Sequence, residues 1–495
     1  MPATFVSDTV AGAASVPTEL LINGEWRPAA SGETLLNVDP VTEEVIAEVA
    51  CAGAEDVDAA VRAARAQFDG GEWSRLSGPE RARLMLRLAD LVERNTAELA
   101  EIQARENGVA PAAAAAFDVP GVIGSLRYFA GWADKITGTV IPTPGFMGRP
   151  THSYTVREPI GVLAAIVPWN FPVVGFANKV APALACGCTA VLKPAEEAQL
   201  AILYLGRLIE EAGFPPGVVN IVQGVGEIAG AALVRHPGVD KISFTGSPEV
   251  GREIQRAAAE TFKRTTLELG GKSPQIVFAD ADVGAAIGST AIGLFVNQGQ
   301  VCAAASRVLV ERSVYDEVVA GLSAAAGGVT LGDPHDPSVT MGPLISQKQL
   351  DRVLGYIDAG KAEGARLCVG GKRPDRLGYF VEPAIFADAT NDMRIAREEI
   401  FGPVGTVIPF DSEDEAVALA NDSVYGLTAT IWTNDVSRAH RLVSKVQAGS
   451  VWVNGWGPSD PRLPWGGMKQ SGFGRELGWA GIEDLTEEKV VTFVL

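Results

Sequence analysis

The sequence predicts an α/β protein built on parallel β-sheets, and two observations predict this class. Short apolar runs alternate with amphipathic stretches from Gly161 onward, which is the pattern of βαβ units. Apolar residues make up 47% of the 495 residues and charged residues 20%, so the chain can bury the large core that such sheets need. We therefore expect two or three domains and no extensive disorder.

The first predicted sheet comes from the middle of the chain. We expect its strands at 161–167, 189–193, 218–222 and 241–244, with helices at 173–185, 194–211, 229–234 and 248–259 between them. The first strand is apolar along its whole length, as expected where helices cover both faces of a parallel sheet. Pro194 suits the first turn of the second helix, and Gly213 supplies its stop.

A second series of apolar runs predicts a second α/β domain. We expect strands at 275–278, 307–310, 404–409 and 428–432, with helices such as 314–325 and 414–421 between them. Segment 140–159 mixes polar and apolar residues around a Pro-Gly turn, and 489–494 is a terminal apolar strand. These two isolated segments either pair with another subunit or form a hairpin on their own domain, and the pattern fits both.

Charge and hydropathy exclude several classes of partner. The 41 basic and 60 acidic residues give a net charge of -19, which repels nucleic acid and anionic membranes. The uncharged stretches 160–178 and 283–306 are interrupted by proline or by amide side chains, so neither predicts a spanning helix. Residues 1–20 have no basic residue ahead of an apolar core, which favours a cytoplasmic protein over a secreted one.

The cysteines and histidines predict neither a disulfide framework nor a metal site. Five irregularly spaced cysteines are too few for such a framework, and Cys186 and Cys188 do not form a Cys-x-x-Cys pair. The four histidines lie in no suggestive motif, which weakens a Cys-His hydrolase reading. We expect at least one free thiol.

Two residues are candidates for covalent and acid–base chemistry. Cys302 follows a predicted helix and is surrounded by small residues that leave its thiol accessible, although an inert cysteine fits the same pattern because reactivity needs a lowered pKa or a nearby base. Glu268 stands between Leu267 and Leu269, where burial raises a carboxyl pKa and suits a general base. A simple ion pair between Glu268 and Lys272 is the alternative.

Three loops at the ends of predicted strands are candidates for ligand contacts. Asn170 could stabilise an oxyanion or simply form a turn. Ser247, after Gly246, suits a helix N-cap whose free amides attract an anion, although an ordinary strand–turn–helix junction looks the same. Beside Lys193, the carboxylate of Glu196 could accept hydrogen bonds from ribose hydroxyls and disfavour a 2′-phosphate, or it could be a solvated helix end.

Taken together and in this order, these motifs resemble the aldehyde dehydrogenase superfamily from Ile22 to the end of the chain. The resembling blocks are Pro168-Trp169-Asn170-Phe171-Pro172, Lys193-Pro194-Ala195-Glu196, Phe244-Thr245-Gly246-Ser247, Leu267-Glu268-Leu269-Gly270-Gly271-Lys272, Gly299-Gln300-Val301-Cys302, Glu398-Glu399-Ile400-Phe401-Gly402-Pro403 and Pro464-Trp465-Gly466-Gly467.

The resemblance implies an oxidation of an aldehyde to a carboxylic acid through a thioester. It makes Cys302 the nucleophile, Glu268 the general base, and Asn170 with the Cys302 backbone amide the oxyanion hole. Lys179 and Glu476 match positions that assist proton transfer. The cofactor is NAD, with NADP less favoured, and its implied contacts are Ile166, Pro168, Trp169, Lys193, Glu196, Gly226, Gly246, Ser247, Glu399 and Phe401.

The resemblance also implies a Rossmann-like NAD-binding domain at 20–139 and 160–267 and a catalytic domain at 268–464. Segments 140–159 and 480–495 form an oligomerisation element of a homodimer or homotetramer. The implied substrate pocket comprises Gly121, Phe171, Gly175, Asn178, Val301, Ala303, Trp456 and Trp465.

The substrate pocket departs from the commoner pattern of the family. Gly121, Gly175 and Asn178 replace larger side chains, which predicts a wide pocket for a bulky apolar or aromatic aldehyde unless other side chains fill the space. A coenzyme A acylating enzyme, an inactive binding relative and a cofactor-free thioesterase-like hydrolase are the alternative functions, and the presence of Glu268, Cys302 and the cofactor residues counts against each of them.

Overall fold

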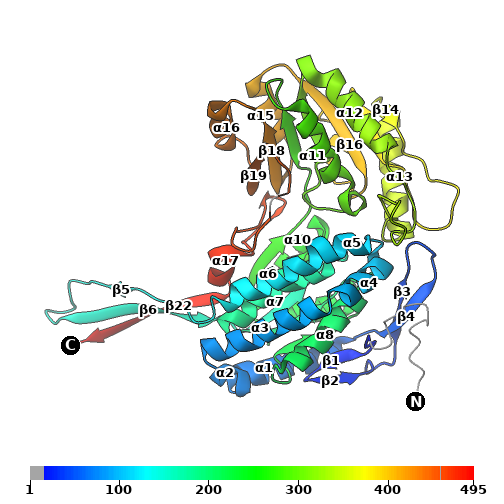
Figure 1. Cartoon of the computed structure of the whole chain (residues 1–495). Helices are drawn as coiled ribbons and strands as arrows, with labels where there is room; N and C mark the ends of the chain where they lie inside the picture. Colours follow the sequence, from blue (N-terminus) through cyan, green and yellow to red (C-terminus); the bar gives the residue numbers. More distant parts are fainter. Residues whose placement is uncertain (1–15, 458) are drawn as a thin grey trace.

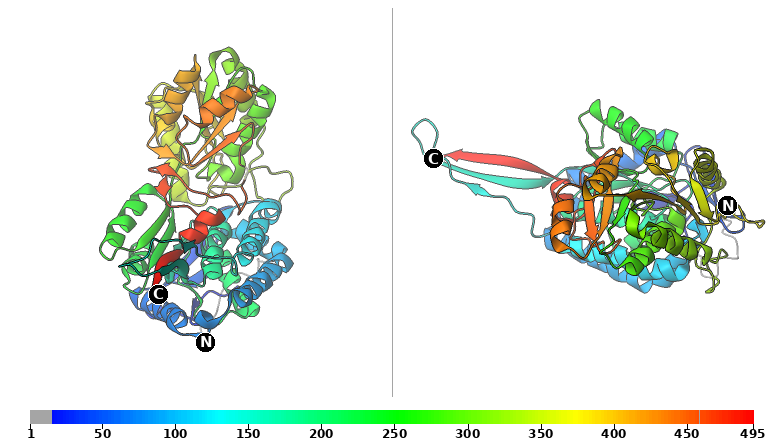
Figure 2. Two further views of the ribbon diagram at one scale, coloured as in Figure 1. Left: turned by 90° about the vertical axis from the view of Figure 1, so that its left-hand side faces the viewer. Right: turned by 90° about the horizontal axis from the view of Figure 1, so that it is seen from above.

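The computed structural model describes residues 16–457 and 459–495, which form two α/β domains and a projecting arm (Figures 1 and 2). The expectation about a secretory leader falls mainly on residues 1–15, outside the described residues. In the described ranges, no helix is long and apolar enough to cross a membrane.

The first domain contains an eight-stranded sheet in the order β2-β1-β9-β8-β7-β10-β11-β21. Its five central strands run parallel, and antiparallel strands close both edges. The strands are β1 (Leu20–Ile22), β2 (Glu25–Arg27), β7 (Val162–Ile166), β8 (Thr189–Lys193), β9 (Val219–Ile221), β10 (Lys241–Thr245), β11 (Arg264–Glu268) and β21 (Gly472–Phe473).

Helices cover both faces of this sheet, which explains why its central strands are buried. In β7, Val162 and Ala164 pack in one apolar core, whereas Leu163 and Ala165 pack in the other. The first face carries α1 (Ala54–Asp69), α9 (Ala231–Arg235) and α10 (Pro248–Ala259). The second face carries α3 (Gly78–Arg94), α4 (Thr96–Asn107), α6 (Val119–Ala130), α7 (Pro172–Cys186) and α8 (Leu200–Ala212).

The helix expected from Pro194 is wrong at its start, because α8 begins only at Leu200. Residues 194–199 form a loop, and a distant carboxylate fixes the helix start. Glu106 of α4 accepts hydrogen bonds from the backbone N–H groups of Leu200 (2.7 Å) and Ala201 (3.0 Å). Glu196 therefore lies in this loop and not in the helix.

The second domain contains a seven-stranded sheet in the order β14-β15-β16-β13-β12-β18-β19, packed between two apolar cores. The strands are β12 (Pro274–Val277), β13 (Arg307–Glu311), β14 (Arg366–Val369), β15 (Ala384–Ala387), β16 (Val404–Phe410), β18 (Thr428–Trp432) and β19 (Ser450–Val453). The helices are α11 (Val283–Phe295), α12 (Tyr315–Gly327), α13 (Gln347–Ala362), α14 (Arg394–Arg397), α15 (Glu413–Asn421) and α16 (Val436–Val443).

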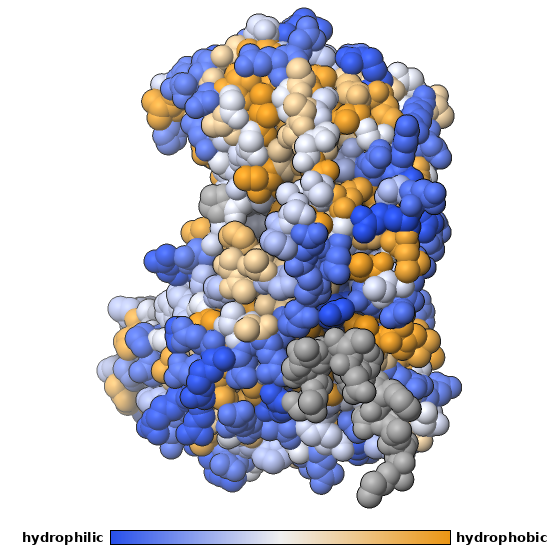
Figure 3. All heavy atoms as spheres, turned by 45° about the vertical axis from the view of Figure 1, so that its right-hand side comes forward, coloured by the Kyte–Doolittle hydropathy of each residue, from blue (hydrophilic) through white to orange (hydrophobic). Residues whose placement is uncertain are grey.

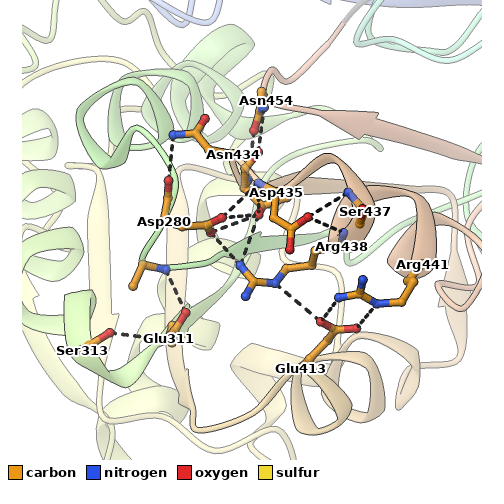
Figure 4. Close-up of polar contacts among 12 residues, drawn as sticks. Asp280, Glu311, Ser313, Glu413, Asn434, Asp435, Ser437, Arg438, Arg441 and Asn454 are labelled. Atoms are coloured by element: carbon orange, nitrogen blue, oxygen red, sulfur yellow. Dashed lines mark hydrogen bonds and ion pairs between the residues drawn. The ribbon is translucent and has the colours of Figure 1, made fainter.

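A polar cluster fastens α16 to the end of β12 in this domain (Figure 4). Asp280 accepts hydrogen bonds from the Asp435 backbone N–H (3.0 Å) and from Arg438 Nη1 (2.7 Å). Arg438 also stacks on Phe278, 4.5 Å from the ring centre, and forms an ion pair with Glu413 of α15. Since its charges are paired with one another, we assign the cluster a structural role.

The arm is an antiparallel sheet that projects from the first domain (Figures 1 and 2). It consists of β5 (Val140–Ile141), β6 (Thr151–Pro159) and β22 (Thr486–Val494), and β22 pairs with β6 along its whole length. The terminal strand is therefore longer than the expected 489–494. Before it, α17 (Gly478–Glu483) returns the chain to the first domain, where it packs against α7.

The remaining elements are short and lie outside these three sheets. Strands β3 (Thr34–Val38) and β4 (Val45–Ala50) pair with each other, as do β17 (Tyr425–Gly426) and β20 (Met468–Lys469). The short helices are α2 (Glu72–Arg75) and α5 (Pro111–Ala113). In Figure 3 the surface narrows at a waist between the two domains.

Candidate active site

Cys302 lies on an unusual loop after α11. Asn297, Gln298 and Gly299 all adopt positive φ angles, at 48°, 57° and 70°, which turns the chain sharply before the cysteine. The Cys302 carbonyl also packs so closely on Gly271 that a Cβ there would collide with it. The Cys302 loop can take this position only because residue 271, three positions after Glu268, is glycine.

Reciprocal hydrogen bonds join the Cys302 loop to the Asn170 loop, which follows β7. Asn170 Nδ2 donates to the Gln300 carbonyl (2.8 Å), and Asn297 Nδ2 donates to the Asn170 carbonyl (3.0 Å). Both partners of each bond are buried. One hydrogen on Asn170 Nδ2 remains beyond the bond to Gln300, and it is available to a developing oxyanion.

The Cys302 thiol lies in a largely apolar cluster and is not acidic. Burial raises its pKa to about 12, and the nearby carboxylates of Glu399 and Glu268 add to the rise, while the backbone N–H groups of Ala303 and Cys302 oppose it. The residue as a whole is partly exposed, although its thiol group is buried. Of the two features that can make a cysteine reactive, the lowered pKa is therefore not found, whereas a nearby carboxylate, that of Glu268, is present.

Glu268 ends β11 and is 4% exposed. Burial raises the pKa of its carboxyl well above the ordinary value, and the Glu476 carboxylate adds to the rise. The alternative ion pair with Lys272 is wrong, because Lys272 Nζ has no hydrogen-bond partner among the described residues. Burial lowers the pKa of Lys272 to about 7.

The two positions considered for proton transfer contact each other directly. Lys179 Nζ of α7 donates to Glu476 Oε1 at 2.5 Å, and both side chains are buried. Lys179 also donates to the hydroxyl of Thr245, at the end of β10 (2.8 Å). The Glu476 carboxylate raises the pKa of Glu268 and the Lys179 ammonium lowers it, so the charges of the three groups affect one another.

The predicted ribose-binding residues gather at the end of β8. Glu196 Oε1 accepts a hydrogen bond from the Gly226 backbone N–H (2.6 Å), and Oε2 lies 3.4 Å from Lys193 Nζ. The Glu196 side chain is 37% exposed whereas Lys193 is buried, so the carboxylate can still reach a ligand. Ile166, at the end of the neighbouring strand β7, is mostly buried.

The predicted phosphate site lies at the start of α10. Ser247 is the N-cap of this helix, its Oγ accepts from the Val250 backbone N–H (3.3 Å), and Pro248 follows at the first helical position. Gly246 N–H donates to the Glu268 carbonyl (3.0 Å), which places this turn beside the candidate base. Ser247 is exposed, so the helix N-terminus is open to an anion.

Glu399 and Phe401 approach the same region from the second domain. Glu399 Oε1 accepts a hydrogen bond from the Gly271 backbone N–H (3.0 Å), and burial raises the pKa of its carboxyl to about 7. Phe401 has a positive φ of 62° and meets the Trp169 ring edge to face at 5.2 Å. Trp169 and Pro168 are only half-buried in the loop after β7. These donors and acceptors have the chemistry that a dinucleotide requires.

Five of the eight predicted pocket residues pack in one apolar cluster with Cys302, namely Phe171, Val301, Ala303, Trp456 and Trp465. The others lie on the helices α6 and α7. A side chain added at Gly121 meets only Val174, at 3.8 Å, so space is open there. A side chain at Gly175 would instead face Val167 and Pro168, and Asn178 is half-buried.

Several residues of the site carry no sequence signal of their own. Trp452 and Leu427 join the apolar cluster around Cys302. Asn297 and Arg475 act on Asn170 and Glu268 through contacts that only the fold creates. The ring centres of Trp452 and Trp456 lie 6.1 Å apart. Trp452 is also only four positions before Trp456 in the sequence, and this is the one signal that could have indicated Trp452 as a pocket residue. The described residues hold no cluster of three or more metal-binding side chains.

Comparison with known proteins supplies the identity of this arrangement. The aldehyde dehydrogenase family model matches residues 26–491. Retinal dehydrogenase 2 of Mus musculus is 49% identical over 477 residues, which cover 96% of this chain and 91% of the mouse protein. The NAD+ complex of an aldehyde dehydrogenase from Bacillus cereus is 46% identical, with a TM-score of 0.96 and 99% of each chain covered. Betaine aldehyde dehydrogenase from Staphylococcus aureus in complex with NAD+ is 39% identical, with a TM-score of 0.96 and 98% and 97% of the two chains covered. The chain therefore belongs to the aldehyde dehydrogenase family and is an NAD-dependent oxidoreductase.

Proposed function

We propose that the enzyme oxidises its aldehyde through a thioester on Cys302. The observation that carries this proposal is the convergence of the thiol, the Glu268 carboxylate and the Asn170 amide at the meeting point of the two domains. Glu268, the carboxylate near the thiol, takes the Cys302 thiol proton as the S–H bond breaks and sulfur bonds to the aldehyde carbon. Asn170 Nδ2 with the Cys302 backbone N–H stabilises the oxygen as it becomes negative. Bound NAD supplies the hydride acceptor that makes this reaction an oxidation.

Glu268 completes the reaction as the general base in this proposal. It takes a proton from water, the water oxygen bonds to the acyl carbon, and the sulfur leaves as thiolate. Its raised pKa supports this role, because a carboxylate with a higher pKa is a stronger base. Lys179 and Glu476 adjoin Glu268 and assist the transfer of its proton. A base of this kind favours water over coenzyme A as the acyl acceptor.

The residues that hold NAD are assigned by the same reasoning. Lys193 and Glu196 take the adenosine ribose together with the turn at Gly226, and Gly246 with Ser247 takes the pyrophosphate. Glu399 takes the second ribose. Ile166, Pro168, Trp169 and Phe401 form the walls around it.

We also propose that the substrate is a bulky apolar or aromatic aldehyde. The aromatic cluster around Cys302 and the open space at Gly121 support this substrate class. The relative named for retinal, an apolar aldehyde, is consistent with it. We place the NAD-binding domain at 20–139 and 160–267, the catalytic domain at 268–464, and the oligomerisation element of a homodimer or homotetramer at 140–159 and 480–495.

The first experiment measures NADH formation by absorbance with NAD or NADP and a panel of acetaldehyde, benzaldehyde and a terpenoid aldehyde. We expect NAD-linked turnover with a higher kcat/KM for the two bulky aldehydes, and none after Cys302→Ser. A preference for acetaldehyde would contradict the wide pocket, and turnover that survives Cys302→Ser would contradict the thioester. Gly121→Met tests the pocket further, because it should reduce kcat/KM for benzaldehyde while acetaldehyde is spared.

A further inference from the structure

The sheet face beneath α7 changes character next to Glu268. Leu163 and Ala165 of β7 are apolar there, as a buried face requires. The neighbouring positions of β10 and β11 on the same face are polar instead, and all are at most 4% exposed. They are Lys241, Ser243, Thr266 and Glu268. The alternate residues on the opposite face, Ile242, Phe244 and Leu267, are apolar.

Two polar networks occupy this face, one beside the other. The inner network adjoins Glu268: Ser243 Oγ donates to Glu476 Oε1 (2.8 Å), and Lys179 Nζ contacts Ser243 Oγ at 3.2 Å. The outer network begins at Thr266, whose hydroxyl donates to Asp484. Lys241 Nζ donates to Thr266 Oγ1 (2.8 Å) and to Asp484 Oδ2 (2.6 Å).

Strand register joins the two networks. Ser243 and Thr266 are direct partners in the parallel pairing of β10 and β11, as are Thr245 and Glu268. Paired residues of adjacent strands lie about 5 Å apart at the backbone, so the two hydroxyls are neighbours on the same face. The polar column therefore runs from buried Glu268 to Asp484, whose side chain is 26% exposed after α17.

Burying this many polar and charged groups is costly, and stability alone does not require it. Each buried charge loses several kcal/mol of hydration, and replacing a buried ion pair by apolar residues is often neutral or stabilising. Lys179, Lys241, Glu268 and Glu476 are all buried beside this face, whereas β7 presents leucine and alanine to it. Exchangeable protons are the property that these residues share and apolar residues lack.

We propose that Ser243, Thr266, Lys241 and Asp484 form the outer half of a proton exit path that leads from Glu268 through Glu476 to solvent. The inference rests on the proposed role of Glu268 as the base. In each turnover one water O–H bond breaks and Glu268 gains that proton, while a C–O bond forms and the C–S bond breaks, with no change of oxidation state in this step. Glu268 must lose the proton before it can act again.

The path moves this proton in successive transfers between neighbouring groups. Glu476 takes the proton from Glu268 and passes it to Ser243 Oγ, whose hydroxyl turns from donor to acceptor toward Glu476. Ser243 gives its own proton to Thr266 Oγ1, its partner in the strand register, and Thr266 gives its own to Asp484 Oδ2, so each hydroxyl keeps one proton and one net proton reaches Asp484. Lys241 Nζ donates to both Thr266 Oγ1 and Asp484 Oδ2, so it holds the hydroxyl and the final acceptor beside each other. These four residues are positioning and relay residues that do not touch substrate.

The experiment compares two kinetic steps by rapid mixing with benzaldehyde and NAD: the burst of NADH and the later release of benzoate. We expect Ser243→Ala and Thr266→Val to keep the burst of the unchanged enzyme but to release benzoate about tenfold more slowly, a fraction of what a lost acid–base group costs. Added imidazole, a small proton carrier, should restore the rate, as should Thr266→Ser. Thr265→Val is the matched control, since Thr265 lies on the opposite face and contacts Gln255.

Two outcomes overturn the exit path. One is benzoate release at the unchanged rate in both variants, and the other is slow release that imidazole and Thr266→Ser leave unaltered, which would mean a structural role. Glu268→Gln separates this inference from the proposed function. If Glu268→Gln slows release while the Ser243 and Thr266 variants do not, only the exit path fails. If Glu268→Gln releases benzoate at the unchanged rate, the proposed base fails with it.

Discussion

At Cys302, burial opposes the chemistry proposed for the residue, and this yields a prediction. Since burial and two carboxylates raise the thiol pKa to about 12, only a small fraction is thiolate at neutral pH. Without cofactor, the rate of Cys302 alkylation by iodoacetamide should therefore rise roughly tenfold per pH unit above neutrality. Peptide mass spectrometry distinguishes the alkylation of Cys302 from that of Cys368, which is also partly exposed. A rate that levels off near neutral pH would indicate a thiolate already formed.

Glu196 carries a prediction about the cofactor. Its carboxylate is fixed by Gly226 N–H and Lys193 Nζ and remains partly exposed, so it repels a 2′-phosphate at the same place. Glu196→Ser removes the negative charge and should raise kcat/KM for NADP relative to NAD by about tenfold, or ~1.4 kcal/mol. Initial-rate measurements with both cofactors test it, with Glu211→Ser, an exposed position of α8, as the control. An unchanged ratio would remove Glu196 from the cofactor site.

At the scale of elements, α8 depends on a residue that is distant in the sequence. Glu106 receives two N–H groups from the first turn of α8, 94 and 95 positions away, in a fully buried setting. Glu106→Ala leaves these donors unpaired, so the free energy of unfolding should fall by about 2–4 kcal/mol. Glu106→Gln, which keeps one acceptor oxygen, should lose less. Urea unfolding measures both, and exposed Glu253→Gln on α10 should be neutral.

The same contrast between local and distant causes explains what the sequence could predict. Strand 189–193 and helix 248–259 have the predicted bounds, because apolar alternation and the Ser247-Pro248 start are local signals. The start of α8 was missed because Glu106 lies in another helix. The catalytic candidates came from motifs and resemblance, and the column from Ser243 to Asp484 could not be predicted, because it needs the register of β10 on β11.

At the scale of the whole molecule, the arm is incomplete as an isolated structure. Helices α17 and α7 contact its strands only at the base, the rest projects away from the domains, and β22 forms a free edge (Figures 1 and 2). Val490 is 65% exposed and Phe493 52%, which is unusual for apolar residues in a strand. A sheet of this size needs a covered face to be stable, so a second copy of the chain is the cover that we propose.

This proposal predicts that assembly can be broken without unfolding the domains. Val490→Asp combined with Phe493→Asp places two charges on the exposed arm, where desolvating them opposes contact with another chain, while neither side chain belongs to a described core. Light scattering should then report the 51.8 kDa monomer in place of a dimer or tetramer. Circular dichroism should be unaltered, and Glu488→Asp on the same strand should leave the mass of the assembly unchanged. If the double variant keeps the mass of the assembly, the contact lies elsewhere and the arm has another role.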